Sequence, residues 1–148
     1  MRLRAAALPP VMLAVALMAP GGCGTTGKSD TSRFSGTDKA VAQAVYDLRD
    51  AVVKRDEGQI CNSYVTTALK DQLAAAAKRD KRGLTCADQL KDSLQDIDAT
   101  DITVTGVTVA PGGKTATATF TTKLPHGKAP TDTFTLARQR NWRLSKLP

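Results

Sequence analysis

The sequence predicts an α+β domain in which N-terminal helices pack on one face of a curved, four-stranded antiparallel sheet. Apolar residues recur every three to four positions between about residues 38 and 95, which is the helical period. From Asp101 onward the period becomes two, which is the period of half-buried strands. The 148 residues suffice for one domain, and 41% hydrophobic residues are typical of a globular protein. Helices followed by strands therefore favour the α+β class.

The first helix is expected over residues 38–55. Its apolar stripe is Val41, Val45, Leu48 and Val52, at spacings of four, three and four. Thr37 is the predicted N-cap, and Asp38 places a negative charge on the first turn. Gly58 is expected to close this element.

Three shorter helical segments are predicted to follow. The second carries Ile60, Cys61 and Tyr64, and the third begins at Thr66 or Thr67 and runs to Ala76. A run of mixed charge over residues 78–83 ends in glycine and indicates a solvated helix end and loop. Thr85 is the predicted cap of the fourth, whose apolar face is formed by Cys86, Leu90 and Leu94.

Four strands are predicted after Asp101. Ile102 and Val104 share one parity and Val107 and Val109 the other, so a bulge at Gly106 would restore a single apolar face. A Pro-Gly-Gly turn at 111–113 precedes a strand at 115–121, a loop at 124–130 precedes one at 133–138, and a turn at 139–141 precedes the last. The side chains expected to point inward on these later strands are Ala116, Ala118, Phe120, Phe134, Leu136, Trp142 and Leu144.

Residues 1–22 are interpreted as a secretion signal. Arg2 and Arg4 precede an apolar run over residues 5–19 and then small residues, which are the three parts of such a signal. The alternative is a transmembrane helix, but this run is shorter than the ~20 residues that span a bilayer. Pro9 and Pro10 would also break its first turn.

Cys23 directly follows these small residues, and the arrangement resembles the lipobox of bacterial lipoproteins. The resemblance implies that Cys23 is lipidated, becomes the mature N-terminus and anchors the protein to the outer face of the cell membrane. Pro20 and Gly21 depart from the residues usual in that family. A conventional cleavage near Gly21 or Gly24 would instead release a secreted protein. Residues 23–36, rich in Gly, Ser and Thr, are predicted to form a flexible tether, and residues 37–148 the folded domain.

Three cysteines are an odd number for an exported protein. If Cys23 carries lipid, then Cys61 and Cys86 remain and are predicted to form a disulfide. Two cysteines and the single histidine at these spacings match no zinc-ligand pattern, and no Cys-x-x-Cys redox motif is present. We therefore expect neither a metal nor a cofactor.

The net charge of +7 falls to +5 once the two leader arginines are removed. This excess would favour an anionic envelope surface. The basic residues are scattered and do not alternate with aromatic residues, so a nucleic-acid partner is not expected.

The order of elements over residues 38–147 resembles the nuclear transport factor 2-like superfamily, a cone-like α+β fold shared with the ketosteroid isomerases and many small bacterial lipoproteins. The resemblance is carried by the long first helix, the 61–73 segment, Cys86 and a final strand with Trp142 at its centre. It implies an apolar pocket between the sheet and the first helix. The expected lining is Val45, Tyr46, Tyr64, Ala116, Ala118, Phe120, Phe134 and Trp142.

Enzymes of that superfamily hold a carboxylate or histidine inside the cone, with a tyrosine or a second acid to stabilise the developing charge. Asp132 shares inward parity with Phe134 but lies at the entrance of its strand, and His126 lies in a loop, so both are expected at the surface. No nucleophile elbow or phosphate-binding loop is present, and no catalytic residue is assigned. The sequence favours a non-catalytic envelope lipoprotein that binds a small apolar ligand or another envelope protein. The alternatives are an isomerase- or dehydratase-like enzyme using Asp132, His126 and a tyrosine, and a filled structural domain.

Overall fold

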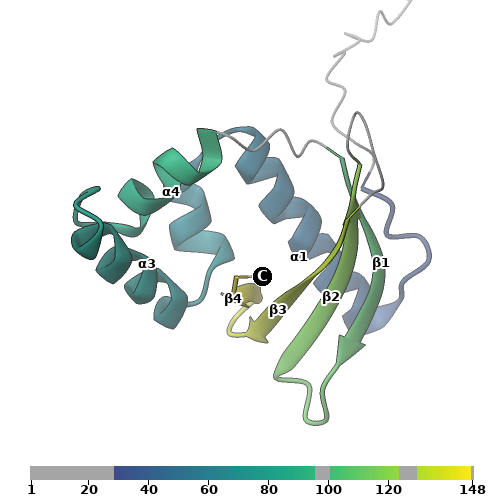
Figure 1. The fold of residues 1–148 in the computed structure, drawn as a ribbon. Coiled ribbons are helices and arrows are strands. Elements are labelled where there is room, and N and C mark those ends of the chain that lie inside the picture. Colours follow the sequence, from purple (N-terminus) through teal and green to yellow (C-terminus); the bar gives the residue numbers. More distant parts are fainter. Residues whose placement is uncertain (1–28, 96–100, 124–129, 148) are drawn as a thin grey trace, which may run out of the picture.

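The computed structural model describes residues 29–95, 101–123 and 130–147. The chain is α+β, with helices along one face and at one end of an antiparallel sheet (Figure 1). The predicted leader at 1–22, Cys23 and His126 lie outside the described residues. The elements are α1 (Gly36–Val53), α2 (Glu57–Gln59), the π-helical turn η1 (Ile60–Tyr64), α3 (Thr67–Arg79), α4 (Cys86–Gln95), β1 (Ile102–Val109), β2 (Thr115–Thr122), β3 (Thr131–Arg138) and β4 (Trp142–Lys146).

Helix α1 has the predicted apolar stripe, but both of its ends differ from the prediction. Ser35, not Thr37, is the N-cap, and its side chain makes no capping hydrogen bond. At the other end Arg55 takes a left-handed conformation (φ 54°), and the amides of Arg55 and Asp56 donate to the carbonyls of Val52 and Ala51. This is the hydrogen-bond pattern of a Schellman motif, so the helix ends before Gly58, which lies inside α2.

The second predicted helix is a short α-turn continued by a π-helical turn. Asp56 caps it by accepting a hydrogen bond from the Gln59 amide at 2.8 Å. The Val65 amide donates to the Ile60 carbonyl, the i→i+5 bond of a π-helix. Helix α3 starts as predicted, because the Thr66 hydroxyl accepts from the Leu69 amide at 3.3 Å.

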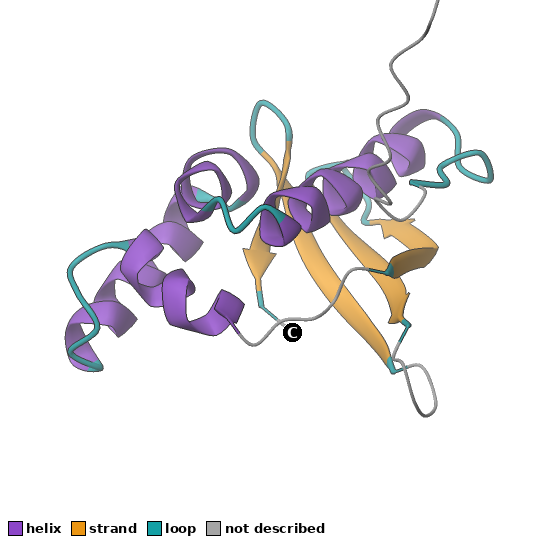
Figure 2. Ribbon diagram, turned by 90° about the horizontal axis from the view of Figure 1, so that it is seen from above, coloured by secondary structure: helices purple, strands orange, loops and turns teal. Residues whose placement is uncertain are grey.

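The sheet has the strand order β1-β2-β3-β4, with every neighbouring pair antiparallel. The predicted bulge is confirmed, because the β1–β2 register shifts between Val104 and Gly106. The sheet is twisted and open rather than closed on itself, and α1 runs across its strands while the other helices gather at one end (Figure 2).

In the described part of the chain, the buried residues form two core clusters. One lies between α1 and the sheet and includes Val41, Val45, Tyr46, Val104 and Ala118, all at most 1% exposed. The other lies between the helices and the β3–β4 end of the sheet. Its buried members include Leu48, Ile60, Leu73, Leu94 and Leu144.

The described part of the predicted tether lies against the domain rather than free of it. The Tyr46 hydroxyl contacts the Asp30 carbonyl at 3.4 Å, and the Arg49 guanidinium donates to the Ser29 hydroxyl at 3.0 Å. Phe34 packs against the core cluster under α1. Polar side chains of α1 therefore contact residues of the segment whose composition predicts a flexible tether. None of the described helices combines the length and apolarity that crossing a membrane requires.

Candidate functional site

The candidate ligand site is an apolar pocket of about 330 Å³ between the helices and the β3–β4 end of the sheet. The helical wall is formed by Leu48, Val52, Ile60, Leu73, Leu90 and Leu94, with Gln89 beside them. The opposite wall is formed by Val65, Phe134, Leu144 and Leu147. The described lining is thus aliphatic and aromatic apart from one amide, which suits an apolar molecule better than a charged one.

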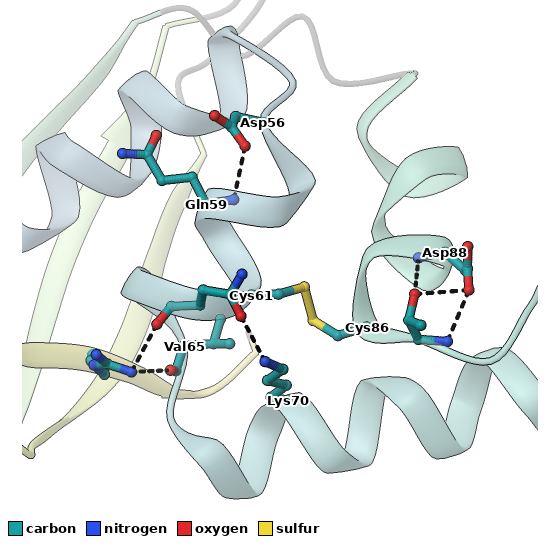
Figure 3. The surroundings of a disulfide bond; sticks show 10 residues. Asp56, Gln59, Cys61, Val65, Lys70, Cys86 and Asp88 are labelled. Carbon is teal, nitrogen blue, oxygen red and sulfur yellow. Dashed lines mark hydrogen bonds between the residues drawn. A yellow bond between two sulfur atoms is a disulfide. The ribbon is translucent and has the colours of Figure 1, made fainter.

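A disulfide holds two parts of the helical wall together. Cys61 of η1 and Cys86 of α4 are bonded, with their Cα atoms 6.1 Å apart, as the sequence predicted (Figure 3). Both are buried, at 4% and 2% exposure. The cross-link therefore fixes α4, which carries Leu90 and Leu94, against the segment that carries Ile60.

A capping box positions the start of α4. The Thr85 hydroxyl accepts from the Asp88 amide at 3.2 Å, and the Asp88 carboxylate accepts from the Thr85 amide at 2.9 Å. The same carboxylate accepts from the Thr85 hydroxyl and the Leu84 amide. These bonds, led by that from the Thr85 hydroxyl, lower the pKa of Asp88 below its ordinary value.

Gly83 is required immediately before this cap. Its φ of 148° is rarely adopted by residues with a side chain, and a Cβ at this position would collide with the Asp88 carboxylate. The close approach of the loop to Asp88 therefore depends on the absence of a side chain here.

The opposite wall is held by contacts between the start of α3 and strand β4. Val65 forms a parallel bridge with Leu144, and the Thr66 amide donates to the Leu144 carbonyl at 2.9 Å. The Arg143 guanidinium donates to the Asn62 carbonyl at 3.1 Å. These bonds partly cover the outer edge of β4 and place Leu144 in the pocket wall.

A second, polar cleft of about 600 Å³ lies between α1, η1 and the β3–β4 turn. Its lining includes Asp47, Tyr64, Arg138, Arg140 and Trp142. Burial raises the pKa of the Tyr64 hydroxyl, and the negative charges of Asp47, Asp50 and Asp56 raise it further. Tyr64 is therefore an uncharged hydrogen-bonding group at neutral pH.

Comparison with known protein families, curated proteins and solved structures finds no match.

The eight residues predicted to line one pocket are distributed over three places. Val45, Tyr46, Ala116 and Ala118 belong to the buried cluster under α1. Phe134 lines the apolar pocket and stacks on Phe120, which is 5% exposed, with ring centroids 4.4 Å apart. Tyr64 and Trp142 line the polar cleft.

The residues considered for catalysis are not brought together in the described part of the chain. Asp132 is exposed and lines neither cavity, and no hydrogen bond joins it to either tyrosine among the described residues. The hydroxyl of Tyr46 contacts backbone groups, and that of Tyr64 lies 3.5 Å from the Gln59 amide nitrogen. The described residues also contain no group of three or more His, Cys, Asp or Glu side chains placed to hold a metal ion.

The residues of α1, α3 and α4 that line the pocket were not predicted from the sequence to do so. The sequence pattern did place these lining residues on apolar helical faces. They are Leu48, Val52, Leu73, Leu90 and Leu94. The pattern indicates that such residues face inward, but it does not indicate which of them border an unfilled space.

Proposed function

We propose that this protein is a non-catalytic lipoprotein of the bacterial cell envelope whose α+β domain binds a small apolar molecule. The observation that carries the proposal is the apolar pocket of about 330 Å³ between the helices and β3–β4. Pockets for small molecules are typically apolar clefts of ~300–1,000 Å³. Transfer of apolar ligand surface from water would supply the binding free energy, at roughly 25 cal/mol per Å² buried.

The walls of the apolar pocket are held in place by the chain itself, which supports a role in binding a small molecule. The disulfide, the capping box of α4 and the Leu144 bridge each fix one side of the pocket through a bond that does not need a ligand. A preformed pocket costs less ordering free energy on binding than one that must be assembled.

We also propose that the domain is related to the nuclear transport factor 2-like superfamily. Support comes from a long α1 packed on the inner face of a sheet, shorter helices at one end, and Trp142 on the final strand. In that architecture the ligand lies between the helices and the sheet, which is also where the apolar pocket of this chain lies.

The proposed location at the cell membrane rests on the N-terminal sequence. A basic start, a short apolar run and small residues before Cys23 support export followed by lipidation of that thiol. Several acyl chains hold a protein on a membrane stably, whereas one chain binds reversibly. Expression of the Cys23→Ser variant in a bacterial host tests this: the wild type should fractionate with membranes and the variant should not. Equal membrane retention of both would refute lipid anchoring at Cys23.

Fluorescence of the uncharged probe 1-N-phenylnaphthylamine tests the binding role. We expect the wild-type protein to enhance its emission saturably, and Leu90→Phe to weaken binding about tenfold because the larger side chain occupies pocket volume. Leu84→Phe is the matched control, since Leu84 is 71% exposed and lies outside the pocket. Absence of saturable binding, or equal effects of the two substitutions, would refute the proposal.

A further inference from the structure

The polar cleft is distinct from the apolar pocket, and none of the described residues lines both. Ala40 and Ala44 of α1 and the indole of Trp142 contribute its apolar surface. Trp142 is 7% exposed, so its ring is held in the core with one part facing the cleft. The lining of the cleft therefore combines apolar and polar side chains.

The two walls carry opposite charges. Asp47 lines the cleft from α1, whereas Arg138 lines it from the end of β3 and Arg140 from the β3–β4 turn. Arg138 is directly opposite Trp142 in the β3–β4 ladder, so the two side chains share the inner face of the sheet. Among the described residues, no ion pair within 4 Å joins Asp47 to either arginine.

Asp47 is the one acid among the described residues that line the cleft, and it takes part in no ion pair within 4 Å among those residues. Its carboxylate accepts one hydrogen bond, from the Gln43 side-chain amide at 2.8 Å. By contrast, Asp50 is paired with the guanidinium of Arg49, and Asp56 caps a helix. The negative charges of Asp47, Asp50 and Asp56 raise the pKa of Tyr64, which also lines the cleft.

These groups define what a ligand must present. Guanidinium groups only donate hydrogen bonds and bind carboxylates in a bidentate manner, whereas an ionised carboxylate only accepts. A ligand that satisfies both walls carries an anionic and a cationic group. Gln43 and Asn141 also line the cleft, and a side-chain amide can both donate to and accept from a peptide bond.

We propose that this cleft binds a short zwitterionic peptide, with its terminal carboxylate at Arg138 and Arg140 and its terminal ammonium at Asp47. The volume of about 600 Å³ accommodates a peptide of a few small residues. The proposal is independent of the apolar pocket, because its binding groups lie on other residues.

Isothermal titration calorimetry of the purified protein with trialanine tests this inference. We expect binding with a dissociation constant of about 1 mM or tighter. N-acetyl-trialanine lacks the ammonium and trialanine amide lacks the carboxylate, so each should bind about tenfold more weakly. Trp142 is the single tryptophan of the chain, and its emission should change with the same saturation curve.

Substitutions test which charged residues of the cleft bind each end of the peptide. Asp47→Asn should weaken trialanine about tenfold and leave N-acetyl-trialanine unchanged, whereas Arg138→Gln with Arg140→Gln should weaken trialanine and leave the amide unchanged. Asp71→Asn and Arg79→Gln are the charge-matched controls on α3, outside the cleft. No binding of trialanine up to about 10 mM, equal affinity for a blocked peptide, or equal loss in the controls would overturn the proposal.

Discussion

The Tyr46 hydroxyl accepts a hydrogen bond from the Val104 amide at 3.2 Å, although the two residues are 58 positions apart. Tyr46 is 1% exposed and Val104 is fully buried. The bond joins the middle of α1 to strand β1 beside its bulge. The same hydroxyl lies 3.4 Å from the Asp30 carbonyl, so one side chain connects the helix, the sheet and the N-terminal segment.

Tyr46→Phe should destabilise the protein by about 1–3 kcal/mol, because the buried Val104 amide loses its partner while the ring remains. Urea unfolding followed by circular dichroism measures the change. Tyr64→Phe is the control, since its hydroxyl is partly exposed and its contact with Gln59 is 3.5 Å long. A loss of equal size in both variants would contradict this role of Tyr46.

The Cys61–Cys86 disulfide should contribute about 3.5 kcal/mol to stability, because it closes a loop with a sequence separation of 25 in the unfolded chain. Replacing both cysteines by serine should lower the free energy of unfolding by roughly this amount. The intact mass of the wild type should increase by two hydrogen atoms on reduction under denaturing conditions. Equal masses with and without reductant would show that the bond is absent.

Asp88 should make stability depend on pH in the acid range. Its pKa is lower in the folded state than in the unfolded state, so the folded state binds fewer protons as the carboxyl titrates. The stabilisation is present above the unfolded pKa of about 4 and is lost as the pH falls through the folded pKa. The free energy of unfolding of the wild type, measured in urea, should therefore fall more than that of Asp88→Asn between about pH 6 and pH 3. An equal fall in both proteins would exclude this contribution.

Gly83→Ala should cost more stability than Gly112→Ala. Both glycines have a positive φ, but a Cβ at Gly83 would collide with Asp88, whereas one at Gly112 would meet no atom within 4 Å. We expect a loss of about 1 kcal/mol at Gly112 and roughly 1–3 kcal/mol more at Gly83. Thermal unfolding of the two variants compares them directly, and equal shifts in Tm would contradict the close approach of Asp88.

The strands and the bulge could be predicted from local side-chain parity, and the disulfide from the number of cysteines in the chain. Side-chain parity placed Val104, Leu136 and Trp142 inward, and all three are buried. The parity change at Gly106 required one extra residue, which the register shift supplies. Counting cysteines led to Cys61 and Cys86 without any knowledge of distance.

The helix ends, the N-terminal segment and the pocket boundaries could not be predicted in the same way. Helix α1 ends at a left-handed arginine, where sequence rules expect glycine. Ser29 and Asp30 belong to a stretch typical of a tether, but Arg49 and Tyr46 hold them through contacts across 20 and 16 positions. Parity indicates the face of Ala116 and Phe134 but not whether the space opposite them is filled.

Methyl chemical-shift mapping tests the central claim, that an apolar ligand binds between the helices and β3–β4, most directly. The protein labelled at Leu, Val and Ile methyl groups is titrated with 1-N-phenylnaphthylamine. We predict shifts at Leu48, Val52, Leu90 and Leu144, which line the pocket, and none at Val41 or Val104, which lie in the solid cluster under α1. Shifts at Val41 and Val104 equal to those at the pocket residues, or no shifts at a saturating probe concentration, would contradict the account.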